Sequence, residues 1–329
     1  LTQYGIEHEL LAQCFMPNIG GIIAVSYVES QFEFNLISPS VLDYSVIDGT
    51  EPAESMLTVN EYIAEDYWSA VNGSSLPENL QGVRSRADEI SEKYGVRILL
   101  SSQCLPACTF AEYPTTTTDQ MDLADEAASI NAALDSLEEA LSLYPEGFFP
   151  QFRSEFGDGG IRIMLVGGFE SNFNMIGYSV QNSLWHNIYV DIFSEGLVGT
   201  YCHEIWHATE DHITSINYGE FDVVQWAELN PDGFQYIFDP AESILNEGDY
   251  TYFGSTKPKD CYFIDGYAKT NEREDRARIM EYAMTGFFGS ELSEYPHLYA
   301  KLRYMSDKIR RYFDTTGWNT PRWEDALGE

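Results

Sequence analysis

The sequence predicts an α+β fold, in which a mixed β-sheet is followed by a mostly helical C-terminal half. Two observations support this prediction. Short apolar runs typical of strands all fall before Ser194, whereas helical patterns separated by loops fill the rest of the chain. The 329 residues include 44% hydrophobic and 14% aromatic side chains, which is enough for a large buried core. The composition is therefore that of a globular protein and not of a disordered one.

Residues 1–80 are expected to form an N-terminal segment or a small subdomain packed on the core. Three parts of this segment have the pattern of regular elements, namely the strands Ala24–Val28 and Phe32–Leu36 and the helix Asn60–Val71. The turn-rich run Gly73–Pro77 marks a break in the chain. We therefore expect the main domain to span residues 81–329.

The main domain opens with alternating helices and strands. Gly82–Tyr94 and Thr118–Tyr144 have the periodicity of amphipathic helices. On the second helix, the apolar residues at helical spacing are Leu123, Ala127, Ile130, Leu134, Leu137 and Leu141. Three apolar runs are predicted as strands, namely Val96–Leu100, Ile161–Val166 and Asn187–Ile192.

Helices and loops make up the remainder. Ser194 is a candidate N-cap for a helix that runs through His207. A loop-rich stretch follows, marked by Pro231, Gly233, Pro240, Gly248 and Gly254. Two helices, Asn271–Gly286 and Glu294–Asp314, close the chain.

The charge of the chain excludes several classes of partner. Its 53 acidic and 18 basic residues give a formal net charge of -35. Such a surface repels nucleic acid phosphates and anionic lipid headgroups, so we expect no nucleic acid partner. No apolar run approaches the roughly 18 residues of a membrane helix, so we expect no membrane insertion. Acidity, together with a start at Leu1 and not at Met, favours a processed protein that is secreted or at the cell surface.

The cysteines do not indicate a fold held together by disulfides. The total of five is odd and low for a disulfide-rich fold. Cys104 and Cys108 are spaced for a small local disulfide, whereas Cys202 is expected to be a small buried side chain.

The strongest motif is His203-Glu204-Ile205-Trp206-His207. On a helix, residues four apart share one face, so the two imidazoles can reach one metal ion. Imidazole is a good zinc ligand, and zinc lowers the pKa of a bound water to about 7. Glu204 lies about 100° around the helix from His203, beside the metal. There its carboxylate can accept a proton from that water.

A catalytic zinc needs a third protein ligand and one open position. The segment Gly266–Ala277 opens a helix, with Thr270 or Asn271 as the cap, and supplies carboxylates in the first turn. Acidic residues are also favoured at a helix N-terminus by the helix dipole. From the residues alone, Glu274, Glu272 and Glu281 all remain candidates for the third ligand.

With HExxH followed by Tyr267, Thr270-Asn271 and Glu274, the chain resembles the gluzincin peptidases, especially the family of the anthrax lethal factor catalytic domain. In that family, a Tyr, a Thr-Asn linker and a Glu seven residues after the Tyr begin a helix downstream of HExxH. The resemblance implies a zincin-like fold and a Zn²⁺ held by His203, His207 and Glu274. It also implies that the Tyr267 hydroxyl supports the oxyanion.

The chain departs from the family pattern at two places. Trp206 stands where the family often has Gly before the second His. The helix that carries Glu274 is interrupted by Asp275, Arg276 and Arg278, where the family continues with apolar residues. These departures put the surroundings of the ligands in doubt more than the ligands themselves.

The neighbours of the motif have less specific patterns. Glu210 and Asp211 are expected at a solvated helix end, with orientation of a ligand imidazole as the alternative. His212 follows the motif closely but lies about 180° around a helix from His203 and about 140° from His207, so we expect no ligand there. The loop Trp226–Phe234 is expected to pack in the core.

Taken together, these features predict a zinc-dependent endopeptidase that acts as a monomer on a peptide or protein substrate. Glu204 is expected to be the general base and then the proton donor to the leaving amine, with Tyr267 as the second catalytic residue. The strand Asn187–Ile192 is expected to pair with an extended substrate. The alternatives are a non-catalytic peptide- or protein-binding module on a retained zincin scaffold and a structural zinc site closed by a fourth ligand.

Overall fold

The computed structural model divides the chain into two compact units, Leu1–Leu76 and Pro77–Glu329. It describes two strands within residues 22–37, and then residues 76–104, 108, 113–154, 157, 159–171, 175–182, 185–217, 221, 223–245, 252–253, 258–289 and 292–328. The sequence placed the boundary four residues later, after residue 80. The helix expected at Asn60–Val71 and the cysteine at position 14 lie outside the described residues.

The first unit contains a β-hairpin. Strands β1 (Ile22–Val28) and β2 (Gln31–Ile37) pair antiparallel, with Ile22 opposite Ile37 and Val28 opposite Gln31. Both strands fall where alternating β-branched and aromatic residues predicted them.

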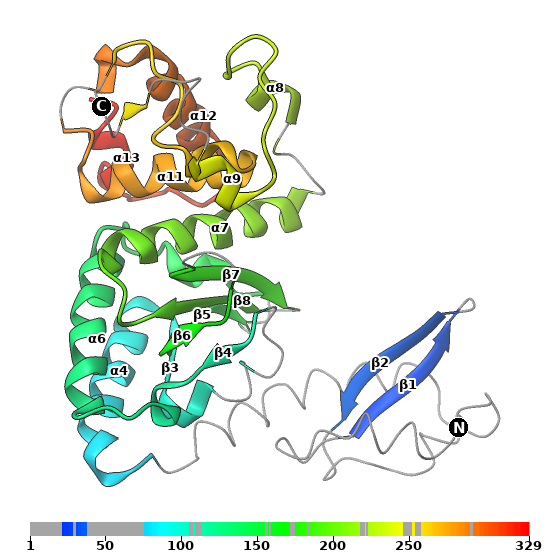
Figure 1. Cartoon of the computed structure of the whole chain (residues 1–329), viewed down its shortest axis with the longest axis vertical. Helices are drawn as coiled ribbons and strands as arrows, with labels where there is room; N and C mark the ends of the chain where they lie inside the picture. Colours follow the sequence, from blue (N-terminus) through cyan, green and yellow to red (C-terminus); the bar gives the residue numbers. More distant parts are fainter. Residues whose placement is uncertain are drawn as a thin grey trace. The chain divides into compact units, whose positions relative to one another are not determined.

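The second unit is built on a four-stranded mixed sheet of order β3-β5-β8-β7 (Figure 1). Strands β3 (Arg97–Leu100), β5 (Gly160–Val166) and β8 (Trp185–Asp191) run parallel to one another, and every residue of β5 is buried. Strand β7 (Gly177–Asn182) runs antiparallel to β8 at one end of the sheet. Two short strands, β4 (Thr115–Thr116) and β6 (Gly168–Phe169), form a separate ribbon. The predicted mixed sheet is confirmed.

The edge of this sheet differs from the prediction. Strand β8, expected to pair with a substrate, lies between β5 and β7, so its backbone groups bond on both sides. That expectation was wrong, because β7 pairs with the outer side of β8 and is itself the strand at this edge of the sheet. The short run Gly177–Asn182 mixes polar and apolar residues and gave no clear strand signal.

Helices α4 (Gln81–Tyr94) and α6 (Glu126–Ser142) lie side by side against the sheet (Figure 1). Helix α6 is shorter than the predicted Thr118–Tyr144. A 3-10 turn with a Thr117–Gln120 capping box comes first, and α6 starts only where Asp125 accepts the Ala128 N–H at 3.0 Å. Local side-chain capping thus overrides the continuous apolar periodicity.

The long helix α7 (Leu197–Asn217) runs between the sheet and the C-terminal helices of this unit (Figure 1). Its first backbone bond joins the Thr200 N–H to the Gly196 carbonyl. The predicted cap, Ser194, instead donates to Asp191 Oδ2 at 3.1 Å. The helix also continues ten residues beyond His207, so the residues after the motif are not at a helix end.

The C-terminal part consists of helices joined by long connections. Among the described residues, the elements are α8 (Val223–Ala227), α9 (Pro240–Leu245), a 3-10 turn (Tyr267–Lys269), α11 (Glu272–Thr285), a second 3-10 turn (Leu292–Glu294), α12 (Pro296–Tyr312) and α13 (Arg322–Asp325). Gly286 ends α11 with φ 77°, a left-handed conformation that favours glycine. Helices α11 and α12 lie close to the predicted bounds, whereas α13, which follows them, was not predicted.

Two negative findings concern the described residues alone. None of their helices combines the length and apolarity that crossing a bilayer requires. Cys104, Cys108, Cys202 and Cys261 are free thiols, so the local disulfide between Cys104 and Cys108 is not formed.

Candidate metal centre

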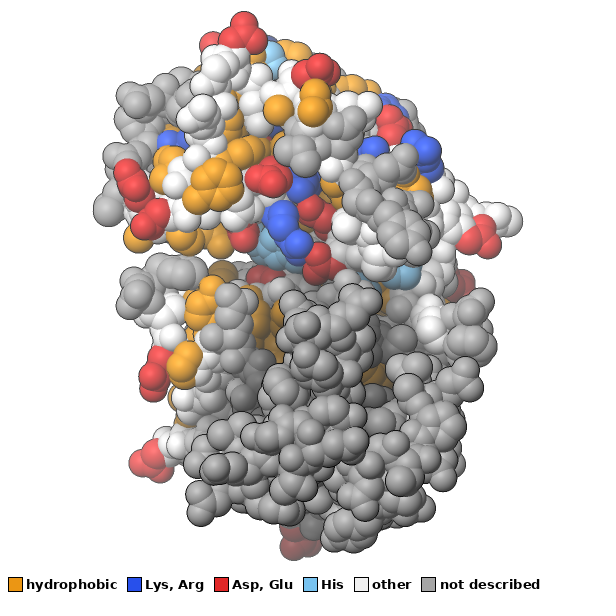
Figure 2. Space-filling model, turned by 90° about the vertical axis from the view of Figure 1, so that its right-hand side faces the viewer, with side chains coloured by type: hydrophobic (Ala, Val, Ile, Leu, Met, Phe, Trp, Pro, Cys, Tyr) orange, Lys and Arg blue, Asp and Glu red, His pale blue; other side chains and the backbone are white. Residues whose placement is uncertain are grey.

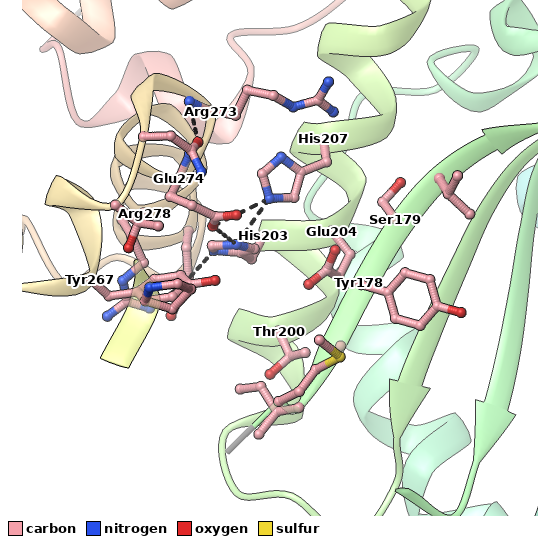
Figure 3. Close-up of a pocket in the computed structure, with 18 of the residues that line it drawn as sticks. Tyr178, Ser179, Thr200, His203, Glu204, His207, Tyr267, Arg273, Glu274 and Arg278 are labelled. Atoms are coloured by element: carbon pink, nitrogen blue, oxygen red, sulfur yellow. Dashed lines mark hydrogen bonds and ion pairs between the residues drawn. The ribbon is translucent and has the colours of Figure 1, made fainter. Parts of the chain in front are cut away.

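Helix α7 places the two motif histidines on one face, one turn apart. The Nε2 atoms of His203 and His207 lie 3.2 Å from each other. Ile205, on the opposite side of the helix, and Trp206, on its flank, are 0% and 1% exposed. Burial of this apolar face fixes the rotation of α7 and turns both imidazoles toward α11 (Figure 3).

The third side chain of the group comes from the first turn of α11. Asn271 caps this helix, and its Oδ1 accepts the N–H groups of Arg273 and Glu274 at 2.9 and 3.0 Å. The cap holds Glu274 so that its Oε2 lies 3.0 Å from His203 Nε2 and 3.5 Å from His207 Nε2. Of the two caps expected from the sequence, the structure uses Asn271.

These three side chains could hold a metal ion. Their ligand atoms lie within 4.8 Å of one another. Ligands bound at about 2.0–2.1 Å to a tetrahedral zinc would be roughly 3.3 Å apart, and the three closest separations here are 3.0, 3.2 and 3.5 Å. Two imidazole nitrogens that face each other repel unless a proton or a cation lies between them. The donor set therefore fits a small divalent cation.

The charges around the group also favour a cation. Burial lowers the pKa of His203, but its bonds to Glu274 and Glu281 outweigh burial and raise the pKa to about 10. Burial raises the pKa of Glu274, but His207 and His203 hold it well below its usual range. The first shift shows that the carboxylates around His203 stabilise positive charge there, and the second keeps Glu274 ionised, as a metal ligand must be.

Glu204 lies beside this group and is not part of it. Its side chain is 4% exposed, and its Oε2 has no hydrogen-bond partner among the described residues. Burial raises the pKa of this carboxyl, although the two histidines oppose the shift. A Cβ at Gly177 would lie 3.1 Å from Glu204 Oε1, so glycine lets β7 approach the carboxylate closely.

Tyr267 lies on the opposite side, in the 3-10 turn before α11. Its ring centroid is 6.3 Å from that of His203 (Figure 3). Burial, together with the negative charge of Glu274 beside its hydroxyl, raises the pKa of Tyr267, so the hydroxyl keeps its proton. A protonated phenol at this place is a hydrogen-bond donor.

Glu281 contacts the second ring nitrogen of His203, the one that is not part of the three-residue group. Its Oε2 is 3.3 Å from His203 Nδ1, and Arg278 pairs with the same carboxylate. Glu281 was an alternative ligand on the sequence alone, but its carboxylate contacts Nδ1, the ring nitrogen of His203 that faces away from the group. The sequence did offer a signal for this role: Glu281 follows Glu274 by seven residues, or two helical turns, so the two side chains share one face of α11. A Cβ at Gly199 would lie 3.0 Å from Glu281 Oε1, so α7 needs a small residue there.

The two acids after the motif bind α11. Glu210 pairs with Arg276, and both side chains are buried at 5% and 4% exposure. Asp211 pairs with Arg273 at 2.7 Å. The expectation of a solvated helix end was wrong for Glu210, because α7 continues and α11 packs over it. Arg276, a departure from the family pattern, is thus a structural contact between the two helices.

The remaining candidates lie elsewhere. His212 packs against the rings of Phe152, Phe313 and His186, at centroid distances of 4.8, 5.3 and 5.8 Å. The loop expected at Trp226–Phe234 packs in the core only in part: Trp226, which lies on α8, is 1% exposed and donates to the Tyr236 hydroxyl, whereas Glu228 and Asp232 are exposed. Glu272 is outside the three-residue group that the described residues form.

The centre opens into a cavity of about 900 Å³. One wall is β7 with the residues before it, and the other is α11 with the connection before α9. Figure 2 shows one face of the molecule, on which histidine, arginine and acidic side chains lie together near the middle.

Comparison of the chain with protein-family models, with curated proteins and with solved structures finds no match. A functional conclusion must therefore come from the side chains of the centre and the chemistry that their arrangement allows.

Proposed function

We propose that the protein is a zinc-dependent endopeptidase with a zincin-like catalytic domain of the gluzincin type. One observation supports this most: three ligand atoms from His203, His207 and Glu274 converge next to Glu204, whose buried carboxylate oxygen has no partner among the described residues. A site that only stabilised the fold would not need that carboxylate.

The donor set favours zinc and leaves a position open. Two imidazoles and one carboxylate are a common ligand set of catalytic zinc, with water or substrate as the fourth ligand. Within the described residues, no fourth His, Cys, Asp or Glu joins the group, which argues against a closed structural site. Two histidines and a carboxylate also serve iron in oxygenases, so the identity of the metal is part of the test.

The bound metal would polarise the substrate carbonyl and lower the pKa of a water molecule. Glu204 accepts the proton of that water at its unpaired Oε2 and then gives it to the nitrogen of the leaving amine. The Tyr267 hydroxyl donates a hydrogen bond to the oxygen on which negative charge develops. Glu281 accepts from His203 Nδ1, which keeps the lone pair of Nε2 directed at the centre.

The substrate is proposed to bind along β7. This strand ends the sheet and has one neighbour, β8, among the described strands. Its residues line the cavity from Gly177 to Gln181. A sheet edge offers free backbone groups to an extended peptide, so main-chain pairing would hold the peptide independently of its sequence.

Metal analysis combined with a cleavage assay tests this proposal. The purified protein should contain about one zinc per chain and should cleave an unfolded protein such as reduced casein. Chelation should abolish cleavage, and added zinc should restore it. Iron in place of zinc, or no metal under zinc-replete conditions, would overturn the proposal. Peptide binding without any cleavage by the zinc-loaded protein would instead favour the non-catalytic binding module.

A further inference from the structure

Phe238 combines two properties that a loop residue rarely has together. Its side chain is 73% exposed, although it is a large hydrophobic group at the cavity wall. Its backbone has φ 59°, in the left-handed region that costs energy for any residue with a Cβ. Among the described residues other than glycine, only Ser101 shares a positive φ. Strain of this kind persists where the surroundings impose it.

The surroundings of Phe238 do impose its conformation. The N–H groups of Ile237 and Phe238 donate to the carbonyls of Lys269 and Thr270, at 3.0 and 2.8 Å. Further along, Ser243 Oγ lies 2.8 Å from Thr270 Oγ1. The segment is thus fastened to the linker that leads into the Glu274 helix. Fastened in this way, the chain turns the Phe238 ring outward, where it lies 6.4 Å from the ring of Tyr236.

The ring borders an apolar surface that extends away from the metal centre. Tyr113, Phe238 and Pro240 line both the main cavity and a second hollow. Across the main cavity, the apolar side chains on and before β7 are Met175, Ile176, Tyr178 and Val180. Phe169 lines the second hollow and packs edge to face on Tyr178, with ring centroids 5.5 Å apart. A substrate side chain between β7 and Phe238 would therefore meet apolar groups on two sides.

The two arginines of the cavity already have partners. Arg273 pairs with Asp211, and Arg278 pairs with Asp265 and Glu281. An acidic substrate side chain would have to break one of these pairs to gain a counterion. An apolar side chain gains contact area without that cost.

From this arrangement we infer that Phe238 determines specificity: it forms a subsite for a large apolar residue, aromatic above all, of an extended peptide that lies along β7. The inference rests on the proposed peptidase function. It explains why a hydrophobic ring is held in a strained, exposed position beside the metal centre. Stacking on aromatic and large aliphatic side chains is the interaction that an exposed phenyl ring offers.

A set of fluorogenic peptides that differ at one position, with Phe, Leu, Ala, Asp or Lys there, tests the inference with the zinc-loaded protein. The position is moved through the residues on both sides of the cleaved bond. At one position, kcat/KM should be highest with Phe. Phe238→Ala should lower kcat/KM for that peptide by about 10- to 100-fold and leave the Ala peptide within about twofold. Phe238→Leu should retain part of the preference.

Two further variants separate recognition from stability. Phe287 is also a large exposed side chain, at 63%, but it does not line the cavity, so Phe287→Ala should leave the preference unchanged. Phe238→Gly relieves the positive φ. Its melting temperature should equal or exceed that of the wild type while the preference for Phe is lost, a combination that a purely structural role cannot produce.

The outcomes distinguish the two proposals. Cleavage by the wild type without an apolar preference, or an unchanged preference in Phe238→Ala, would overturn the subsite and leave the peptidase function standing. A zinc-loaded wild type that cleaves no peptide in the set and no unfolded protein would overturn the proposed function itself.

Discussion

The two helices that meet at the candidate metal centre differ in how much they depend on buried charges. Helix α7 packs through apolar side chains, of which Tyr201, Cys202, Ile205 and Trp206 are at most 1% exposed. Helix α11 also buries apolar side chains, such as Ile279 and Met284 at 0% exposure, but it buries charged side chains among them. Asp275 and Lys301 are both 0% exposed and lie 2.7 Å apart, next to the buried pair of Arg276 and Glu210.

Because of this difference, substitutions near α7 and near α11 should affect the centre differently. Apolar packing has no strict direction and tolerates modest changes of shape. A buried ion pair fixes the register of a helix, but removing one partner leaves an uncompensated charge. The ligands on α7 should therefore withstand substitutions nearby, whereas Glu274 depends on the charges that dock its helix.

The largest effect is expected from a change on α7 that leaves packing intact. Glu204→Gln keeps the shape of the side chain but cannot accept a proton from water. We expect kcat to fall by about 10²- to 10⁴-fold, which corresponds to at most about 5 kcal/mol, with the metal content unchanged. The assay is peptide cleavage, with metal measured on the same sample. Activity within about tenfold of the wild type would remove Glu204 from the mechanism.

On α11, breaking the deepest ion pair should destabilise the whole unit. Lys301→Met leaves Asp275 buried without its counterion, and the free energy of unfolding should fall by roughly 3–5 kcal/mol. Urea denaturation measures the change. The matched control is Lys259→Met, because Lys259 and Glu294 form a surface pair with side chains 70% and 51% exposed. That loss should stay below about 1 kcal/mol. Equal losses in both variants would contradict the contrast between the helices.

Lowering the pH should destabilise the packing of α7, because two buried histidines, one of them on this helix, must stay uncharged in the folded protein. His186 and His212 are buried beside Phe152, and burial lowers the pKa of each to about 4. Well above pH 6.5 both are neutral in the folded and the unfolded chain, so their titration does not change the free energy of unfolding there. Between pH 6.5 and 4 only the unfolded chain takes up their protons, so stability falls as the pH falls.

His212→Phe isolates this contribution. Between pH 7.5 and pH 5, the wild type should lose about 2 kcal/mol more than the variant, since one such histidine is removed. The difference between the two pH values, measured by urea denaturation, cancels any change in packing common to both. Identical pH dependence in the two proteins would show that His212 does not stay neutral in the fold.

Glu274→Ala removes the ligand that α11 supplies. Zinc affinity should fall more than about 100-fold, which exceeds the loss expected from groups that only orient a ligand. His212→Ala should bind zinc nearly normally, because its ring packs among Phe152, Phe313 and His186. Competition with a chromogenic chelator measures both affinities. The reverse result would move the third ligand to α7 and refute the gluzincin assignment.

The same contrast explains what the sequence could predict. The spacing of His203 and His207 is local, so helix periodicity alone brings the two rings together. Glu274 is 71 residues away from His203, and only the family resemblance chose it from the three candidate acids Glu272, Glu274 and Glu281 of α11. The structure brings Glu274, and not Glu272, to the group because the Asn271 cap and the buried charges set the rotation of that helix.

The features that sequence reasoning missed are non-local. Arg276 looked like an interruption of an apolar helix because its partner, Glu210, lies on another element. Strand β7 is short and partly polar, so it has no strong pattern, although it forms the edge of the sheet beside the centre. Phe238 lies in a loop, where neither exposure nor a positive φ leaves a periodic signal.

Glu281 offers the finest test of how α11 supports α7. Its carboxylate meets His203 Nδ1, whereas His207 Nδ1 has no hydrogen-bond partner among the described residues. His203 is thus the imidazole whose orientation depends on α11. Partners that orient a ligand histidine typically contribute 10- to 100-fold to metal affinity. Glu281→Ala should therefore weaken zinc binding by about 10- to 100-fold, less than Glu274→Ala. Arg278 keeps its second partner, Asp265, so the variant leaves no arginine without a counterion.

The matched control for Glu281→Ala is Glu272→Ala, which removes the same charge from the same helix without touching a ligand. If long-range charge alone holds the metal, the two variants should lose similar affinity, and the loss should shrink in high salt. If orientation matters, only Glu281→Ala should weaken binding strongly, and Glu281→Gln should recover part of the loss because its amide oxygen can still accept from Nδ1. Equal losses for Glu281→Ala and Glu272→Ala would mean that α11 contributes charge to the centre but does not position the imidazole of α7.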